Sequence, residues 1–380
     1  LKFSLPNPYA PFLENLTLKI LPRHIWENVP AKSFALAEFN VKPVGTGPYL
    51  VKSFQKDKQG RIKSYELAAF SKYFLGKPHI ESLKFIFFDS EESLIAALNK
   101  KTVMAGAAIK PKNLEKIKKS GLSVLNLNMP RYYAVFFNAG RSEILENKSL
   151  RLALNLAADK SQIVEKALAG KGIIVDSPIL PGYLGYGPAL KKYEYSPEKA
   201  KEILEKAKFS SPLEITLTIP QSPELIEAAA ILRDNWQKIG VKTNLRVLAP
   251  PEIQEVIKQR DYEAIIFGEI LNLDPDPFPF WHSSQKNDPG LNLAMYENKQ
   301  ADKLLEEARQ TLKENERAQK YENFQKVLIE DAPAVFLYSP DYIYLINKKI
   351  KGIELKSVIL PSKRFGEIEK WYIETERVWK

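Results

Sequence analysis

Hydrophobic and polar positions form their clearest pattern between residues 213 and 270. Apolar and polar side chains alternate over residues 213–219 and again over 241–247, which predicts two β-strands that each bury one face. Between them, apolar residues recur at spacings of three and four over residues 225–239, which predicts an amphipathic helix. A shorter helix and a third strand over residues 263–270 complete the segment.

This alternation of strands and helices predicts parallel strands joined by crossover helices. In open parallel sheets, ligands bind beyond the carboxyl ends of the strands. Residues 271–277 (LNLDPDP) follow the third strand, so we expect them to form a binding loop. An extended ligand could also pair as an added strand with main-chain groups at this strand end, and the residues concerned are Gly268, Glu269, Ile270, Leu271 and Asn272.

Other periodic segments surround this unit. The first third of the chain is rich in strands and turns, whereas the rest is rich in helices. Strands are predicted over residues 49–54, 63–68, 83–88, 334–338 and 342–346. Helices are predicted over 90–98, around 150–157, from Asp159 to near Gly170, after Ser196, and over 299–312 and 316–329.

The composition limits the possible functions. Hydrophobic residues make up 44% and charged residues 27% of the 380 residues, which is typical of a globular protein large enough for two cores. Cysteine is absent, which excludes disulfides, thiolate zinc sites and cysteine nucleophiles. His24, His79 and His282 are far apart, so no pair has the spacing of metal ligands. We therefore predict neither a metal ion nor a cofactor.

The net charge of +10 fits either an anionic partner or a surface of solvated lysines. Basic residues are interleaved with glutamates, as in residues 199–202 (KAKE), which favours the solvated surface. We predict no nucleic-acid partner, although a basic nucleic-acid-binding protein stays as a less favoured alternative. No apolar run approaches the roughly 18 to 20 residues that span a bilayer. Residues 1–4 (LKFS) lack a signal-peptide pattern, so we expect any export signal to lie outside this sequence.

Several short motifs occur in a fixed order over most of the chain. They are residues 45–49 (GTGPY), 73–78 (YFLGKP), 134–138 (AVFFN), 150–160 (LRLALNLAADK), 195–200 (YSPEKA), 274–277 (DPDP) and 281–284 (WHSS). Together they resemble the extracellular solute-binding proteins of family 5, the oligopeptide- and dipeptide-binding components of ABC importers.

The resemblance implies an α/β protein of the bilobed periplasmic-binding-protein class (class II type), with two mixed α/β lobes joined by a hinge. We expect a first lobe of residues 1–138 plus 340–380 and a second lobe of residues 139–339. Such a monomer would close on a short peptide in an interlobe cleft and deliver it to an ABC transporter permease. It would be extracytoplasmic, in the periplasm or at the outer face of the cytoplasmic membrane, and would catalyse no reaction.

Two departures from the family pattern affect this expectation. Family members are longer at the amino end, so we expect the first lobe to be incomplete and membrane contact to come only through a missing anchor or the permease. Peptide-binding members hold the amino group of the ligand with an aspartate four positions before the proline of an Asp-Pro pair. If Asp276 and Pro277 are that pair, Leu273 occupies the anchor position. A sugar, a metal chelate or a signalling peptide is therefore an alternative ligand.

The candidate ligand contacts each have a structural alternative. Asp274 and Asp276 could contact the ligand beyond the strand end or, as Asp-Pro pairs, form turns. Asn138 could bond to a peptide backbone. Aromatic side chains offer large contact areas to peptides of varied sequence, with core packing as the alternative, and the candidates are Tyr133, Phe137, Trp281 and Tyr338.

A hydrolase is the last alternative. His282 precedes two serines, but a serine hydrolase also needs an aspartate partner and a nucleophile turn, and neither pattern is present. We therefore predict a binding protein.

Overall fold

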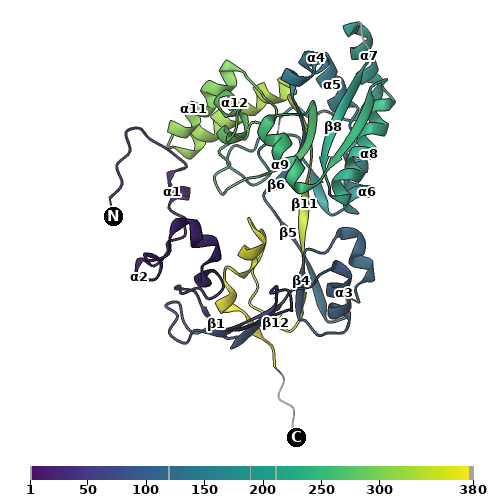
Figure 1. Cartoon of the computed structure of the whole chain (residues 1–380). Coiled ribbons are helices and arrows are strands. Elements are labelled where there is room, and N and C mark those ends of the chain that lie inside the picture. Colours follow the sequence, from purple (N-terminus) through teal and green to yellow (C-terminus); the bar gives the residue numbers. More distant parts are fainter. Residues whose placement is uncertain (1, 119, 189, 210–211, 376–380) are drawn as a thin grey trace. The chain divides into compact units, whose positions relative to one another are not determined.

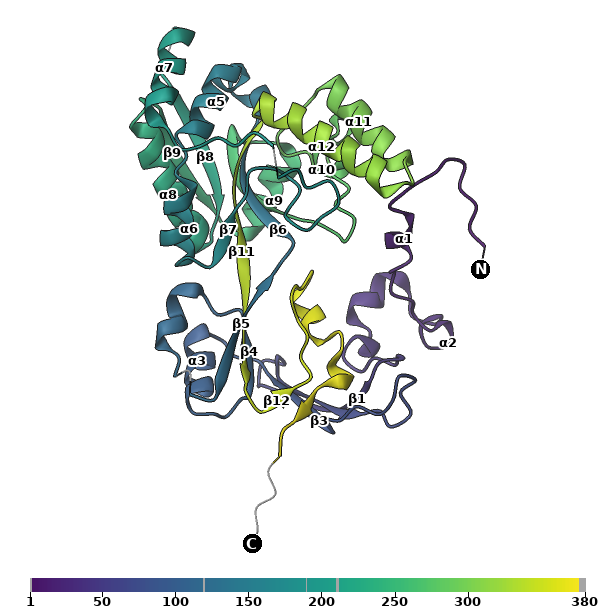
Figure 2. The ribbon, with the colours of Figure 1, turned by 180° about the vertical axis from the view of Figure 1, so that it is seen from behind.

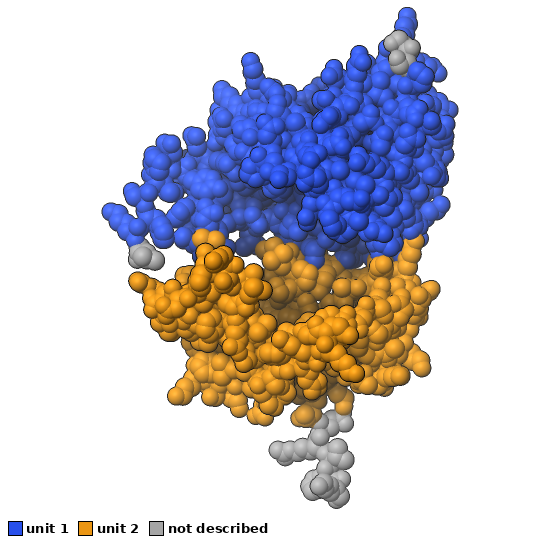
Figure 3. Space-filling view, viewed as in Figure 1, with its two compact units in different colours: residues 1–17, 129–341 blue, residues 18–128, 342–380 orange. Residues whose placement is uncertain are grey.

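The computed structural model describes residues 2–118, 120–188, 190–209 and 212–375 (Figure 1). The chain divides into two compact units (Figure 3). Unit 1 comprises Leu1–Thr17 and Met129–Asp341, and unit 2 comprises Leu18–Asn128 and Tyr342–Lys380. Residues 129–138, expected in the first lobe, belong to unit 1 because their strand pairs with strands of that unit. The predicted boundaries of the two lobes stay a prediction.

Unit 1 is built on the strand–helix–strand–helix–strand segment. β8 (Glu214–Pro220) pairs in parallel with β9 (Lys242–Leu248) on one side and with β10 (Ala264–Ile270) on the other. The crossovers are α8 (Pro223–Gln237) and α9 (Pro250–Gln259). The predicted parallel strands with crossover helices are therefore confirmed.

Antiparallel strands extend this sheet. β6 (Arg131–Phe137) pairs with β10, and β11 (Ala334–Asn347) pairs with β6 and with β7 (Gly172–Ile174), so the central order is β11-β6-β10-β8-β9. The prediction of separate strands on either side of Pro340 is wrong, because β11 runs through this residue. The fixed φ of proline is compatible with an extended chain, and Pro340 lies opposite Gly172 of β7.

Helices pack on both faces of the sheet (Figure 2). One core cluster joins the sheet to α5 (Lys148–Leu156), α6 (Lys160–Leu168), α7 (Pro197–Ala207) and α8. Its largest side chain is Trp236, which is fully buried and donates from Nε1 to the carbonyl oxygen of Leu154 at 3.0 Å. The predicted amphipathic helices are confirmed here as the elements that bury their apolar faces against the strands.

The other face packs against α9, α10 (Phe278–Trp281), α11 (Lys299–Gln310) and α12 (Glu314–Asp331). β6 is buried on both faces, because Val135 belongs to the first core and Phe136 to the second. A strand covered on both faces has a continuous apolar run instead of an alternating one. This explains the sequence AVFF in the second half of β6.

Unit 2 contains a three-stranded antiparallel sheet of β1 (Tyr49–Lys56), β2 (Ile62–Ala69) and β3 (Ser82–Ile86). α3 (Glu91–Asn99) follows, and its N-cap Ser90 accepts a hydrogen bond from the backbone N–H of Ser93 at 3.2 Å. The predicted strands and the predicted short helix are confirmed within two residues at each end.

Short strands complete unit 2. β4 (Ala105–Ala107) and β5 (Leu122–Asn128) both pair with β11, and β12 (Ile350–Lys351) pairs with β13 (Tyr372–Ile373). A core cluster that includes Ile95, Leu98 and Leu345 lies between α3 and these strands. The short helical turns of the chain are α1 (Phe12–Asn15), α2 (Arg23–Trp26), α4 (Glu143–Glu146), η1 (Ala31–Leu36), η2 (Glu38–Asn40), η3 (Pro111–Lys116), η4 (Ala139–Arg141), η5 (Ser283–Gln285), η6 (Pro361–Phe365) and η7 (Ile368–Lys370).

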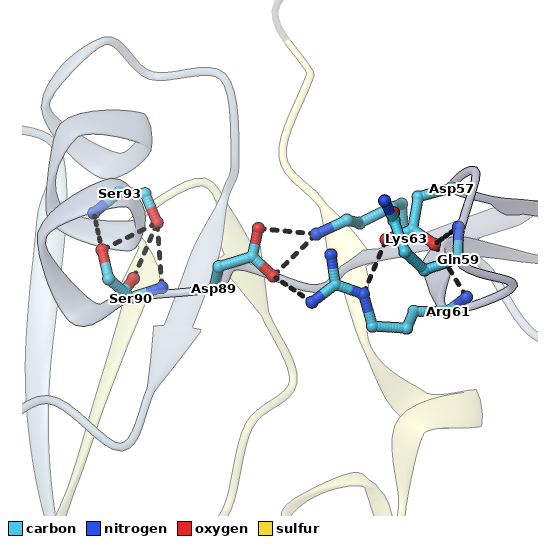
Figure 4. Close-up of polar contacts among 7 residues, drawn as sticks. All are labelled: Asp57, Gln59, Arg61, Lys63, Asp89, Ser90 and Ser93. Carbon is cyan, nitrogen blue, oxygen red and sulfur yellow. Dashed lines mark hydrogen bonds and ion pairs between the residues drawn. The ribbon is translucent and has the colours of Figure 1, made fainter.

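The turn between β1 and β2 is held by an exposed polar network (Figure 4). Asp57 accepts hydrogen bonds from the backbone N–H groups of Gln59 at 3.0 Å and Arg61 at 2.9 Å, and from the Arg61 side chain at 2.7 Å. Lys63 pairs with Asp89, just before the N-cap of α3, at 2.6 Å. Exposed ion pairs contribute at most about 1 kcal/mol each, so this network fixes the turn more than it stabilises the unit.

Among the helices that the structure describes, none is long and apolar enough to cross a membrane.

Candidate functional site

The carboxyl end of β10 lies beside two antiparallel strands. Tyr338 of β11 is opposite Tyr133 of β6, and Tyr133 is opposite Gly268 of β10. Farther along the same pair of strands, Arg131 is opposite Ile270. Opposed and alternate residues share one face of a sheet. We call these five residues the strand-end platform.

The platform is layered around the ring of Tyr133. A Cβ atom on Gly268 would lie 2.8 Å from Cε1 of Tyr133, so only glycine lets this ring lie across β10. The guanidinium carbon of Arg131 lies 5.1 Å from the centre of the same ring, within the range of a cation–π contact. The ring of Tyr338 is 5.4 Å from that of Tyr133 at an interplanar angle of 40°.

The platform is accessible at its outer end and buried at its inner end. Tyr338 is buried, Arg131 and Tyr133 are half-buried, and Ile270 is 43% exposed. Burial raises the pKa of Tyr338, with further contributions from Tyr133 and Glu224 that Arg131 opposes. The phenol of Tyr338 therefore stays protonated near neutral pH.

Two residues of the predicted binding loop extend the accessible surface. Asn272 is exposed, and Leu273 is 70% exposed. Leu271, by contrast, is buried against the second core. The loop thus presents an amide and an apolar side chain next to the platform, and ligand contact by these residues stays a prediction.

The two aspartates of the loop are held by arginines of the α11–α12 pair of helices. Asp274 pairs with Arg317 of α12 at 3.0 Å, and both side chains are about a tenth exposed, at 11% and 9%. Asp276 receives two hydrogen bonds from Arg309 of α11, from Nε to Oδ1 at 2.9 Å and from Nη2 to Oδ2 at 2.7 Å. The two carboxylates therefore fasten the loop to the helices.

A hydrogen bond inside the loop supports the turn interpretation. Oδ1 of Asp274 accepts from the backbone N–H of Asp276 at 3.2 Å, as an aspartate does in a local turn. The backbone N–H of Asp274 donates to the carboxylate of Glu14, which burial leaves with a raised pKa. Burial also raises the pKa of Asp274, and the charge of Arg317 opposes this effect. Direct ligand contact by either loop aspartate stays a prediction.

Three predicted contacts lie inside unit 1. Phe137 is 1% exposed and belongs to the first core, and Trp281 is fully buried in the second core, 5.8 Å from the ring of Phe136. Asn138 is also buried, and its Nδ2 donates to the carbonyl oxygen of Arg260 at 3.0 Å. The structure therefore buries these three side chains within unit 1, and ligand contact by them stays a prediction.

Glu269 is a buried carboxyl group on the opposite face of β10. It accepts a hydrogen bond from the hydroxyl of Tyr132, while its Oε1 has no partner among the described residues. Burial raises the pKa of Glu269 well above its usual value, and the bond from Tyr132 only partly opposes this. Burial therefore favours the protonated form of this side chain, which faces the second core.

Arg131 was not among the residues predicted for the site. It precedes Tyr133 by two positions on a strand, and this spacing places both side chains on one face. The period-two rule could have identified it. A charged residue at a strand end is common, however, and gave no separate signal.

Metal ligation finds little support in the described ranges. No three histidine, aspartate or glutamate side chains gather there closely enough to hold a metal ion.

Unit 2 has a pocket of about 380 Å³ between β5, the end of β11 and β12, with Lys348 and Lys351 in its lining. No predicted site residue lines this pocket.

Comparisons with known proteins give a consistent result. Residues 1–290 match the model of the bacterial extracellular solute-binding proteins, family 5 Middle. The chain is 28% identical to the oligopeptide-binding protein AppA of Bacillus subtilis, over 98% of this chain and 70% of that protein. It is 26% identical to the dipeptide-binding protein of Escherichia coli, over 92% of this chain and 66% of that protein.

The fold is shared with solved structures. The structure of AppA from Bacillus subtilis in complex with a nonapeptide superposes with a TM-score of 0.77 at 25% identity, and it covers 98% of this chain and 76% of that one. The chain thus spans from 66% to 76% of the length of these relatives. The resemblance and the fold class predicted from the sequence motifs are confirmed.

Proposed function

Because the chain belongs to family 5 of the bacterial extracellular solute-binding proteins, we propose that it captures short peptides and delivers them to the permease of an ABC importer. The observation that carries this proposal is the pair of relatives named for oligopeptide and dipeptide binding, which match 98% and 92% of this chain. The family is extracellular, and capture would take place outside the cytoplasm.

The strand-end platform supports a peptide ligand. Tyr133 offers aromatic surface that tolerates side chains of varied shape, because every apolar group gains from contact with it. The exposed end of β10 at Ile270, and Asn272 just beyond it, could supply main-chain groups to an extended peptide. Backbone pairing gives affinity that depends little on peptide sequence, as a transporter of mixed peptides requires.

The surroundings of His282 support binding without turnover. Its Nδ1 accepts from the backbone N–H of Ser284 at 3.1 Å and lies 2.8 Å from the Ser284 hydroxyl, so the imidazole caps the short helix η5. The ring is buried and stacks on Phe278 with 4.1 Å between centres. A general base needs a free nitrogen directed at a reacting group, whereas Nδ1 is committed to the cap and Nε2 lies 3.3 Å from Oε1 of Glu306.

Thermal unfolding with and without ligand tests the proposal. The protein is heated alone, with a mixed pool of tri- to hexapeptides, and with a pool of oligosaccharides at the same concentration. Binding to the native state stabilises it by about 2.7 kcal/mol when the free ligand is at 100 times its Kd. We expect a saturable rise in the midpoint with peptides and none with oligosaccharides.

Other outcomes would contradict the proposal. A rise with oligosaccharides only would assign a sugar ligand to the same fold. Stabilisation by DNA that is lost steeply between 50 and 200 mM salt would favour the nucleic-acid alternative, because each neutralised phosphate adds about one unit to the log–log salt slope. Release of amino acids from the peptide pool would identify a hydrolase.

A further inference from the structure

Among the residues that the structure describes, the side chain of Arg131 has no charged or hydrogen-bonding partner. No ion pair or side-chain hydrogen bond involves its guanidinium among the described residues, and its buried Nε lacks a partner. By contrast, Arg309 and Arg317 of the same unit each pair with a carboxylate of the loop. The Nε of Arg317 also lacks a partner, so what distinguishes Arg131 from these two arginines is that no described carboxylate pairs with its guanidinium.

The contact with Tyr133 leaves the donors of Arg131 free. A guanidinium that lies over an aromatic ring uses its face for the cation–π contact, while its N–H groups point outward in its own plane. Gly268 leaves room for the ring, because a side chain at that position would collide with it. The three residues thus fix the arginine at a half-buried strand end with its hydrogen-bonding edge unused.

Glu224, at the start of α8, is a carboxylate close enough to this cluster to affect Tyr338. Its charge raises the pKa of Tyr338, whereas the charge of Arg131 lowers it. Glu224 accepts a hydrogen bond from the hydroxyl of Ser222 at 2.8 Å and makes no ion pair with Arg131. The other carboxyl group of this strand end, Glu269, points to the opposite face of β10 and is bonded by Tyr132. Within the described part of the chain, no carboxylate therefore pairs with this guanidinium.

We propose that Arg131 binds a carboxylate of the ligand, in the form of a two-pronged contact at the edge of the strand-end platform. The proposal rests on the proposed peptide-binding function and adds the group that the site recognises. A planar guanidinium matches a carboxylate with two parallel N–H···O bonds, and such charge-assisted bonds are stronger than neutral ones. The ligands favoured here are peptides with a free carboxyl end or an acidic side chain near it.

Two matched peptide pools test this proposal in the wild-type chain. One is a pool of tetrapeptides with free carboxyl ends and neutral side chains, and the other is the same pool with carboxyl-terminal amides. Their affinities are measured by titration calorimetry at a fixed ionic strength. A charge-assisted contact corresponds to roughly a tenfold preference or more for the free acid.

Variants show whether Arg131 causes that preference. Arg131→Gln is expected to bring the ratio of the affinities for the acid and amide pools to about one, while Arg131→Lys keeps part of the preference because it keeps the charge without the fork. Arg141→Gln is the matched control, since Arg141 is exposed in η4 of the same unit and loses the same charge. It is expected to keep the wild-type ratio.

The outcomes separate this proposal from the function on which it rests. Equal binding of both pools by the wild type would overturn the carboxylate site while peptide binding stands, and this result needs no variant to fold. A preference that survives in Arg131→Gln would assign the carboxylate to another residue. Failure of both pools to bind would overturn the peptide function and the carboxylate site together.

Discussion

The contact between Asp274 and Arg317 is expected to hold the predicted binding loop in place. Arg317 is 7% exposed, its Nη2 lies 3.0 Å from Oδ2 of Asp274, and its Nε has no partner in the described part of the chain. The change Asp274→Ala removes the carboxylate and leaves the charge of the arginine buried without compensation. It also removes the acceptor for the backbone N–H of Asp276.

The size of the effect follows from burial. Breaking a buried ion pair from one side costs about 3 to 5 kcal/mol, and the whole unfolding free energy of a typical protein is only about 5 to 15 kcal/mol. We expect the lower end, about 3 kcal/mol, because each side chain keeps about a tenth of its exposure, at 11% and 9%. Replacement of both partners, as Asp274→Leu with Arg317→Met, is expected to recover most of this loss, since no unpaired charge remains.

Urea denaturation of the wild type, of Asp274→Ala and of the double variant measures these unfolding free energies directly. The matched control is Asp234→Ala, which breaks an exposed pair with Arg233 whose side chains are 65% and 46% exposed, and which is expected to cost less than about 1 kcal/mol. If Asp274→Ala lost no more stability than Asp234→Ala, the reasoning that this carboxylate fastens the loop would be refuted.

Two further changes test the platform and the buried carboxyl group. Gly268→Ala places a Cβ 2.8 Å from the ring of Tyr133, so it should cost about 1 to 3 kcal/mol and weaken peptide binding, with Gly140→Ala as the control. In a Tyr133→Ala background the same change should cost little further stability, whereas additive effects of the two changes would count against the layered arrangement. Burial raises the pKa of Glu269, so its contribution to stability is complete below the unfolded value of about 4.3 and is lost as the pH rises toward the folded value. The wild type should therefore lose unfolding free energy relative to Glu269→Gln as the pH rises above about 4.3. Urea titrations in which the difference between the two proteins stays constant from that pH to neutrality would argue that the carboxyl group does not titrate as described.

The sequence predicts the β8–α8–β9–α9–β10 segment well because its signals are local. The alternating and helical periods of residues 213–270 each lie within one element, and the strands pair in parallel as this order of elements requires. The prediction of a strand break at Pro340 was wrong because the continuity of a strand is not a local property. A proline removes one hydrogen-bond donor, but whether a strand continues through it depends on neighbouring strands that local pattern does not specify.

The site was less predictable because its decisive contacts are distant in sequence. Asp274 and Asp276 are paired by Arg317 and Arg309, which lie more than thirty residues later on two other elements. The burial of Trp281 depends on the second core forming over β6, a strand far earlier in the chain. Chain pattern therefore identified the loop after β10 as a candidate but could not show which of its polar groups were already occupied.

Native mass spectrometry of the purified chain with the tetrapeptide pool tests the central claim most directly. The account predicts a complex of one peptide with one chain. The population of this complex saturates as the pool concentration rises, and it decreases when a competitor peptide of different mass is added. A chain that carries no peptide at saturating concentrations, while it retains a cooperative thermal transition, would contradict the claim that this protein is a peptide-binding component of an importer.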